Sequence, residues 1–292
     1  MEIIGHQKIR NFLDRSMEKK SIANAYLFSG SEHLGKFTLA LEFAKKIVGG
    51  AEQKVNPDII VISPEIEEKK GVVKKKDIKV EKIRELEHQL GLSSYFSKHR
   101  VAIIDDADRL TISSQNALLK TLEEPSEGCI LILVCHNQEK ILPTIKSRCS
   151  IKKFGLVSEE EISEFLDEKE KQKDILFWSF GRPGIAVSLQ QEEGELEKKK
   201  EIRKEFEEIL DANLSDKFAL AENLAKDSEN LLDRFGLWTM LLRKRMLSEE
   251  TLLQITSQKA LRLIEEIEKS TKLIRETNSN LRVILESLFL KF

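Results

Sequence analysis

Two short segments of the chain carry residue types that could bind a nucleotide. The first, GSEHLGKFT, places Gly30, Gly35 and Lys36 at the spacing of a phosphate-binding loop. Backbone N–H groups of such a loop and of the following helix face phosphate oxygens, and Lys36 adds a positive charge. The second, VAIIDDAD at 101–108, is an apolar run that ends in Asp105, whose carboxylate could act on Mg²⁺. Together the two segments predict a nucleotide site.

Both segments differ from those of a working ATPase at the positions that coordinate the metal and polarise the attacking water. Phe37 stands where a Ser or Thr hydroxyl would coordinate Mg²⁺, and a phenyl ring cannot bind a hard cation. Thr38 follows, but one helical step turns a side chain by about 100°, so we expect its hydroxyl to point away from the metal. Asp106 stands where many such ATPases have a Glu that polarises water, and it is one methylene shorter. We therefore expect nucleotide binding to survive better than hydrolysis.

These motifs need a sheet and helices to position them. Four apolar runs separated by helical stretches predict a parallel sheet covered on both faces, in an α/β domain that ends near residue 155. After that point helical periodicity predicts a small helical domain over 156–197 and an amphipathic helical domain over 198–292. The four expected strands are AYLFS at 25–29, DIIVIS at 58–63, RVAIID at 100–105 and CILILVC at 129–135.

Composition restricts the class of protein. Charged residues make up 34% of the 292 residues, yet the formal net charge is only -2, so no domain-wide basic field indicates nucleic-acid binding. The three cysteines, Cys129, Cys135 and Cys149, form no CxxC pair and offer no zinc ligand set, which favours a reducing cytoplasm. The longest apolar runs are shorter than the roughly 20 residues of a membrane helix, so we expect no membrane association.

A lysine-rich stretch, EEKKGVVKKKDIK at 67–79, could be an exposed excursion or a site for a phosphate backbone. Its central Gly71-Val72-Val73 is typical of a hairpin tip or an exposed loop. Short runs of mixed charge are common on ordinary surfaces, so the sequence favours a solvated excursion.

The run SQNALLKTLEEPSEGCILILVCHNQEKILPTIKSRC at 114–149 resembles the signature of clamp-loader subunits of the AAA+ family. That family includes the gamma/tau and delta prime subunits of bacterial DNA polymerase III and, more distantly, the eukaryotic clamp loaders. The resemblance is strong over the first 190 residues and weaker beyond them, where TNSNLRVILESLFL at 277–290 carries it. Four further segments look most similar to delta prime, namely NAYLFSG at 24–30, NPDIIVISPE at 56–65, IKVEKIREL at 78–86 and IDDADRL at 104–110.

The resemblance implies a complete architecture and a set of partners. It implies an AAA+ domain with a P-loop over 1–155, a helical lid over 156–197 and an oligomerising helical collar over 198–292. The chain would then help load the sliding clamp onto primed DNA, together with the gamma/tau and delta subunits of the polymerase holoenzyme. The family's usual zinc module is missing, because residues 37–100 contain no cysteine.

The resemblance also assigns roles to single residues. Arg148 would act as an arginine finger on the ATP of a neighbouring gamma/tau subunit, whereas without the resemblance it is a surface arginine paired with a carboxylate. His136 and Asn137 would occupy the region of the first sensor, or one of them merely ends the strand. Gly184 stands in place of an arginine that senses the γ-phosphate, and Arg182 lies two residues too early. Asp105 and Asp106 could instead cap the next helix with Asp108.

Three functions remain open on these residues. The first is a delta prime-like subunit with little or no ATPase activity, which needs no cofactor, binds ATP or ADP weakly at most and holds no zinc. The second is an active AAA+ ATPase of the gamma/tau type, in which Thr38 and Asp106 replace the usual residues. The third is an interaction scaffold.

Overall fold

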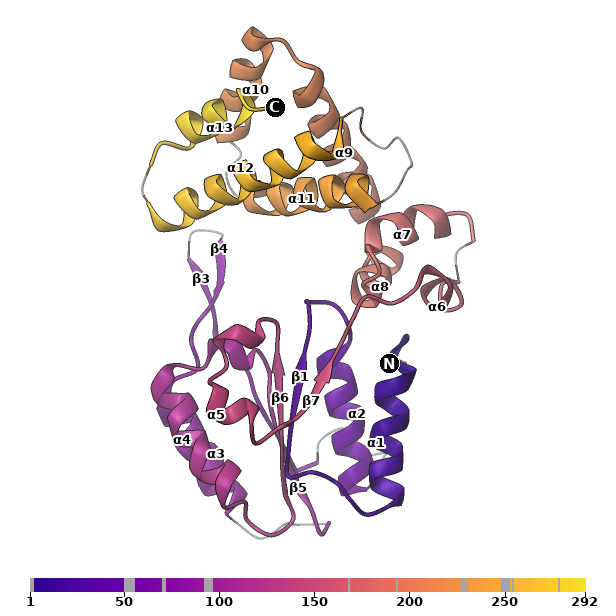
Figure 1. Cartoon of the computed structure of the whole chain (residues 1–292), viewed down its shortest axis with the longest axis vertical. Helices are drawn as coiled ribbons and strands as arrows, with labels where there is room; N and C mark the ends of the chain where they lie inside the picture. The colour runs from indigo at the N-terminus through magenta and orange to yellow at the C-terminus, as the bar shows by residue number, and fades with distance from the viewer. Residues whose placement is uncertain are drawn as a thin grey trace. The chain divides into compact units, whose positions relative to one another are not determined.

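Contacts divide the chain of the computed structural model into two units, Met1–Gln191 and Glu192–Phe292 (Figure 1). Helices expected in a separate lid fall within the first unit, so the finer division at residues 155 and 197 stays a prediction. No helix among the described residues is long and apolar enough to cross a membrane. The structure describes residues 3–49, 56–69, 72–91, 97–167, 169–192, 194–226, 230–247, 253, 255–277 and 279–292.

The first unit is built on a five-stranded parallel sheet with the strand order β2-β5-β6-β1-β7. The four runs expected from the sequence form four of its strands, which confirms the α/β class. The fifth, β7, was not predicted, because SIKK contains a single apolar residue; it becomes a strand by pairing along β1 at the edge of the sheet. The strands are β1 (Ala25–Ser29), β2 (Ile59–Ile62), β5 (Arg100–Ile104), β6 (Cys129–Cys135) and β7 (Ser150–Lys153).

Side-chain alternation along the strands supplies two apolar cores. Tyr26 and Phe28 pack on one face with helices α1 (Gln7–Glu18) and α2 (Lys36–Val48). Ala25 and Leu27 point to the other face, where α3 (Val80–Leu90) and α4 (Ile112–Glu123) pack. Figure 1 shows these helix pairs on opposite sides of the sheet. Because both faces are covered, the strands are apolar at consecutive positions instead of every second one.

Short elements connect the strands and complete the first unit. A two-stranded antiparallel hairpin is formed by β3 (Ile66–Lys69) and β4 (Val72–Lys75), as the lysine-rich stretch suggested, although Gly71 of the expected tip lies outside the described residues. The remaining elements are η1 (Ala107–Arg109), η2 (Gln138–Lys140), α5 (Pro143–Lys146), α6 (Glu159–Ser163), α7 (Gln172–Ser179) and α8 (Pro183–Gln191).

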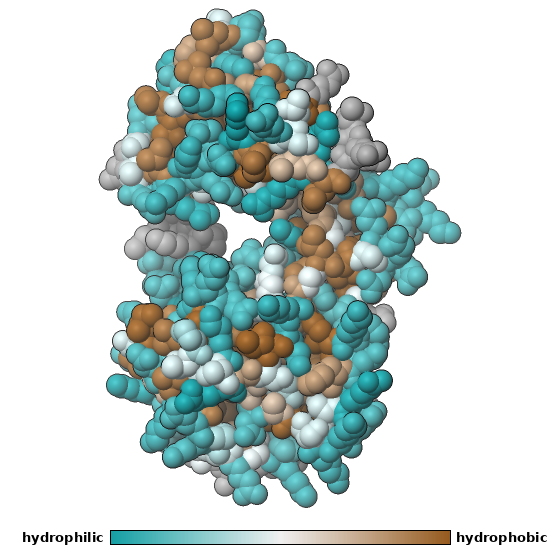
Figure 2. Space-filling model, viewed as in Figure 1, coloured by the Kyte–Doolittle hydropathy of each residue, from teal (hydrophilic) through white to brown (hydrophobic). Residues whose placement is uncertain are grey.

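The second unit is helical and is held by an aromatic core. Trp238 is fully buried and stacks on Phe206 with a centroid distance of 5.1 Å, and Phe289 and Phe292 surround it. On the face seen in Figure 2, hydrophilic side chains dominate the surface of both units, as the charged composition requires. The helices are α9 (Glu195–Asp211), α10 (Leu214–Lys226), α11 (Leu231–Leu247), α12 (Ser257–Glu276) and α13 (Leu281–Phe289).

Candidate nucleotide site and the Arg148 surface

The carboxyl ends of β1, β5 and β6 lie side by side in the parallel sheet and place their following residues at one edge. A cavity of about 330 Å³ opens there. It brings together six of the residues predicted from the sequence, Gly35, Lys36, Thr38, Asp105, Asp106 and His136. Its other lining residues are Glu32, His33, Leu34, Phe37, Lys75, Val134 and Gly184.

Two of the predicted glycines serve different purposes. Gly35 has a φ of 80° at the start of α2, and a Cβ there would meet no atom within 4 Å, so the space beside the loop is open. Gly30 is not among the lining residues. A Cβ on Gly30 would lie 2.4 Å from the carbonyl oxygen of Phe154, so this glycine is required by the close approach of the chain after β7.

The Lys36 ammonium is buried and already has partners inside the chain. The residue is 3% exposed, and its Nζ donates to the carbonyl oxygen of Ser31 and, at 3.2 Å, to Nδ1 of His136. Burial lowers the pKa of the Lys36 ammonium. A phosphate that entered the loop would therefore compete with contacts that the lysine makes without it.

The carboxylate of Asp106 is occupied at both oxygens. His136 Nε2 donates to Oδ1, and Lys75 Nζ donates to Oδ2 at 2.6 Å. The side chain is only 3% exposed. The hydrogen bond from His136, followed by that from Lys75, holds the pKa of the Asp106 carboxyl well below its usual range, although burial acts in the opposite direction.

These contacts form one continuous chain of hydrogen bonds. Lys36 donates to Nδ1 of His136, so the ring proton of a neutral His136 resides on Nε2, from which it is donated to Asp106. Lys75 closes the chain from the other side. A general base must reach the proton that it accepts and works best with a pKa near the working pH. Asp106 has a donor at each oxygen and a pKa held well below that range, which makes it a weak base independently of its shorter side chain.

The residues at this edge do not fit Mg²⁺ in the way that a P-loop ATPase requires. The position that would supply a hydroxyl ligand is Phe37, which is half-buried and packs against the core cluster of α1 and α2. Asp105 accepts the backbone N–H of Asp106, and burial raises the pKa of its carboxyl. Thr38 does line the cavity. Among the described residues no group of three His, Cys, Asp or Glu side chains is arranged to hold a metal ion.

The backbone of the loop is packed against α8. The N–H of Gly184 donates to the carbonyl oxygen of His33 at 2.8 Å. A Cβ at position 184 would lie 3.0 Å from the same oxygen, so a longer side chain there would require the loop to move. Burial lowers the pKa of the His33 imidazole, and the nearby positive charge of Arg182 lowers it further. Arg182 is not among the residues that line the cavity.

The structure separates two alternatives that the sequence left open. Asn137 does not line the cavity; its side-chain oxygen accepts the N–H of Glu139 and caps η2, whereas His136 is part of the site. Asp106 precedes η1, but its side chain makes no capping hydrogen bond there. Asp108 instead accepts the backbone N–H of His136 at 2.9 Å. The alternative in which Asp105, Asp106 and Asp108 cap the next helix is therefore not the one that Asp106 adopts.

Arg148 lies outside this cavity, at the end of the turn that follows α5. Its Nη2 is 2.6 Å from Oε1 of Glu123, and its Nη1 donates to the carbonyl oxygen of Thr144 at 3.0 Å. The side chain of Arg148 is 36% exposed and that of Glu123 is 50% exposed. Such an exposed pair is worth little energetically, so Arg148 can leave it for a phosphate. Burial raises the pKa of the neighbouring Cys149 thiol to about 12, which disfavours the reactive thiolate.

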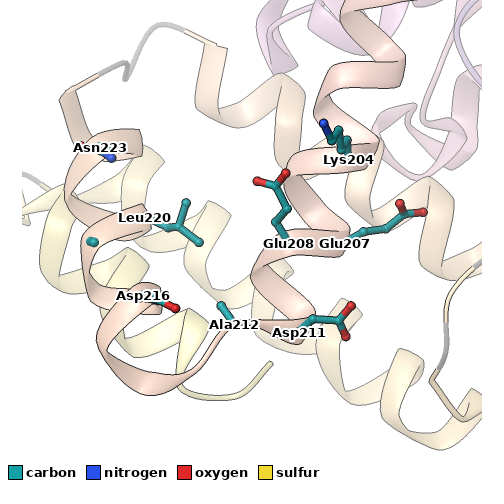
Figure 3. Close-up of a pocket in the computed structure, with 9 residues that line it drawn as sticks. Lys204, Glu207, Glu208, Asp211, Ala212, Asp216, Leu220 and Asn223 are labelled. Carbon is teal, nitrogen blue, oxygen red and sulfur yellow. The ribbon is translucent and has the colours of Figure 1, made fainter.

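A larger cavity lies in the second unit, and none of the site residues predicted from the sequence lines it. It has a volume of about 610 Å³ and is lined by residues of α9 and α10, among them four acidic residues, Lys204 and Leu220 (Figure 3). The four acidic residues are Glu207, Glu208, Asp211 and Asp216. Its negative lining makes it unsuited to a nucleotide phosphate.

The family model described as "DNA polymerase III, delta subunit" matches residues 5–157, just over half of the chain, which include Arg148 and all the residues that line the cavity except Gly184. The chain belongs to the clamp-loader family of AAA+ proteins. The "Replication factor C small subunit" of Methanococcus maripaludis is 30% identical over 197 residues, which cover 68% of this chain and 58% of the relative. The "DNA polymerase III subunit delta'" of Bacillus subtilis is 29% identical over 178 residues, which cover 56% of this chain and 51% of the relative.

Solved structures of the same fold extend over both units. A gamma subunit-related protein of DNA polymerase III from Thermotoga maritima has a TM-score of 0.53 at 17% identity and covers 95% of this chain and 97% of its own. The RuvB Holliday junction branch migration motor of the same organism has a TM-score of 0.55 at 18% identity, with 90% and 95% covered. At these identities the likeness concerns the fold alone. The matches to the first curated relatives span less than two thirds of those proteins.

Sequence reasoning missed two residues that matter to the site and its surroundings. Lys75 was placed in a solvated excursion, because no spacing rule connects a hairpin lysine with a carboxylate 31 residues later. Glu123 was read only as part of a family signature. Its contact with Arg148 depends on how α4 packs against α5, which local sequence patterns do not show.

The ionisation of Asp106 predicts a pH dependence of stability. Because its pKa is lowered in the folded chain, the carboxylate stabilises the fold above the unfolded-state pKa of about 4, and this contribution is lost as the pH falls below that value. Asp106→Asn should therefore lower the thermal unfolding midpoint at neutral pH, and its deficit against the wild type should shrink below about pH 4.

Scanning calorimetry between neutral and acidic pH measures this deficit. Asp14→Asn is the matched control, because Asp14 forms an exposed ion pair with Lys46 at 3.0 Å, and its substitution should have little effect at any pH. A deficit of Asp106→Asn that is the same at every pH would contradict the assignment of a charged, doubly hydrogen-bonded Asp106.

Proposed function

We propose that this chain is a delta prime-like, non-motor subunit of a DNA polymerase III clamp loader. It helps load the sliding clamp onto primed DNA and contributes Arg148 in trans to the ATP site of a neighbouring gamma/tau subunit. Its own ATP hydrolysis is weak or absent. Family membership supports the clamp-loader part of this proposal, and the residues of the two sites support the division of labour.

The observation that carries the proposal is the contrast between Asp106 and Arg148. The Asp106 carboxylate, at the position of the catalytic base, is buried with both oxygens occupied by side chains of the same chain. The Arg148 guanidinium is exposed and contacts the solvent-accessible carboxylate of Glu123, a backbone oxygen and a hydroxyl oxygen. An arginine finger needs no competent site on its own subunit, because it stabilises charge on the phosphate of a neighbour.

The partners in this proposal are the gamma/tau and delta subunits, with the clamp and primed DNA as the substrates of the assembly. The helical second unit would form the oligomeric contacts, since long amphipathic helices bury an apolar stripe. DNA contact would be directed at the phosphate backbone and shared among subunits, because the net charge of -2 provides no strong field of its own. A cytoplasmic site of action follows from the proposed role in replication.

Arg148→Ala in a reconstituted loader should abolish the contribution of this finger to hydrolysis at the neighbouring site. An arginine finger supplies roughly 10³ to 10⁵ in rate, so the phase of phosphate release from that site should be lost while assembly is unchanged. Pre-steady-state phosphate release in the presence of clamp and primed DNA measures this phase, and size-exclusion chromatography checks assembly.

Two further variants separate the finger from a general effect of surface charge. Arg15→Ala removes an exposed arginine on α1 and should leave the rates unchanged. Glu123→Gln removes the ionic partner of Arg148 but keeps the guanidinium, so hydrolysis should not fall below the wild-type rate. A normal rate for Arg148→Ala would show that Arg148 is not the finger.

A second candidate, an active ATPase of the gamma/tau type, has one observation in its favour. Thr38, which carries the hydroxyl nearest in sequence to Lys36 on its C-terminal side, is among the residues that line the cavity. Calorimetric titration of the isolated chain with Mg-ATP, followed by a phosphate-release assay, distinguishes the two functions. We expect no turnover above background, because both oxygens of Asp106 accept hydrogen bonds from the chain itself and its pKa is lowered. Turnover that is lost in Lys36→Ala would favour the ATPase.

A further inference from the structure

The candidate nucleotide site contains a positive charge that none of its motifs supplies. Lys75 reaches into the cavity from β4, and its Nζ lies 2.6 Å from Oδ2 of Asp106. Asp105 and Glu32 line the same cavity, so with Asp106 it contains three carboxylates. Among the lining residues, Lys36 is the second lysine beside Lys75. A divalent metal would compensate these charges in a working P-loop ATPase.

Lys75 is held in this position by its backbone. It pairs with Ile66 in the hairpin, and the N–H of Lys76 donates to the carbonyl oxygen of Glu65 at 2.8 Å. The Arg109 guanidinium donates to the carbonyl oxygen of Lys75 at 2.9 Å. Arg109 belongs to η1, which directly follows Asp106. The end of the hairpin is therefore tied to the same turn that carries the carboxylate.

A second tie extends the contact between the two segments. Ile78 and Leu110 form an isolated parallel bridge, and the N–H of Ile78 donates to the carbonyl oxygen of Arg109 at 2.9 Å. Ile78 is fully buried in the core cluster of α3 and α4. Lys75 thus stands three residues from a core anchor, and its ammonium is directed to Asp106 by fixed backbone on both sides.

We propose that Lys75 is a built-in cation that takes the place of a divalent metal at this site. Asp106 is 3% exposed, and a buried carboxylate needs a positive partner or a hydrogen-bond donor at each oxygen. Lys75 and His136 supply both donors. Mg²⁺ would need several oxygen ligands at fixed positions, and Phe37 removes one of them. The pocket is charge-compensated by the chain itself and requires no metal.

This inference deepens the proposed function, because it rests on the view that the chain's own site is not a working ATPase. It adds a reason that concerns a segment outside the nucleotide motifs. In a chain whose site must bind and release a metal with each nucleotide, a hairpin lysine bound to the general base would inhibit hydrolysis. In a chain whose site does not hydrolyse ATP, the same lysine stabilises the turn between β5 and η1.

Manganese alone, without nucleotide or partner subunits, tests the inference on the full chain. Mn²⁺ prefers the same carboxylate ligands as Mg²⁺ and can be followed by electron paramagnetic resonance. For the wild type we expect no Mn²⁺ bound at this site and the same thermal midpoint with Mn²⁺ as with EDTA. Lys75→Ala should lower the midpoint and gain Mn²⁺ affinity by at least about tenfold, and added Mn²⁺ should restore part of the lost stability.

Two controls locate the effect. Lys76→Ala removes the adjacent exposed lysine, whose Nζ lies 3.7 Å from Glu67, and it should behave as the wild type. The double variant Lys75→Ala with Asp105→Asn should lose the gained Mn²⁺. These measurements use the chain alone, so their outcome is separate from that of the Arg148 test in the assembled loader. A normal rate for Arg148→Ala would not contradict the inference about Lys75, and a failed Mn²⁺ test would not contradict the role of Arg148.

Two results would overturn the inference. One is a Lys75→Ala variant that folds but gains no Mn²⁺. The other is wild-type protein that binds Mn²⁺ and loses it in Asp105→Asn, which would show that a metal and Lys75 coexist at the site. Where Lys75→Ala does not fold, the wild type and Asp105→Asn still test the inference, which predicts that neither protein binds Mn²⁺ at this site.

Discussion

The functional interpretation of this chain depends on the double occupation of the Asp106 carboxylate. His136 and Lys75 each donate to one of its oxygens, in a turn that the sheet places beside the phosphate-binding loop. A buried carboxylate without these donors would be costly, so the contacts stabilise the fold while they engage both oxygens of the residue at the position of the general base. Under the proposed function, the same contacts account for weak or absent hydrolysis at this site.

The same constraint reaches the loop through His136. Because the ring links Asp106 to Lys36, the cation that would meet a phosphate is hydrogen-bonded within the chain. Arg148 is under no such restraint, since its pairing with Glu123 is exposed and therefore weak. Under the proposed function, this contrast suits the chain to act on phosphate held by another subunit. Residues 5–157 match the family model that places the chain among the clamp-loader proteins.

The sequence predicted the features that depend on local pattern. Continuous apolar runs predicted four of the five sheet strands, and the spacing of Gly35, Lys36 and Asp105 predicted residues that do line one cavity. It could not predict β7, whose polar SIKK segment becomes a strand only through the ladder offered by β1. Lys75 escaped prediction for a related reason. Its role follows from the pairing of the hairpin end with η1, a tertiary contact that leaves no periodicity in the sequence.

The central claim is that this chain completes the ATP site of a neighbour, and photo-crosslinking tests it most directly. An ATP analogue with a photoreactive group on its γ-phosphate, bound to the assembled loader, should label the segment of this chain that contains Arg148. That label should vanish when the gamma/tau subunits are left out. Labelling of the gamma/tau subunits without any label on the Arg148 segment would contradict a role in trans.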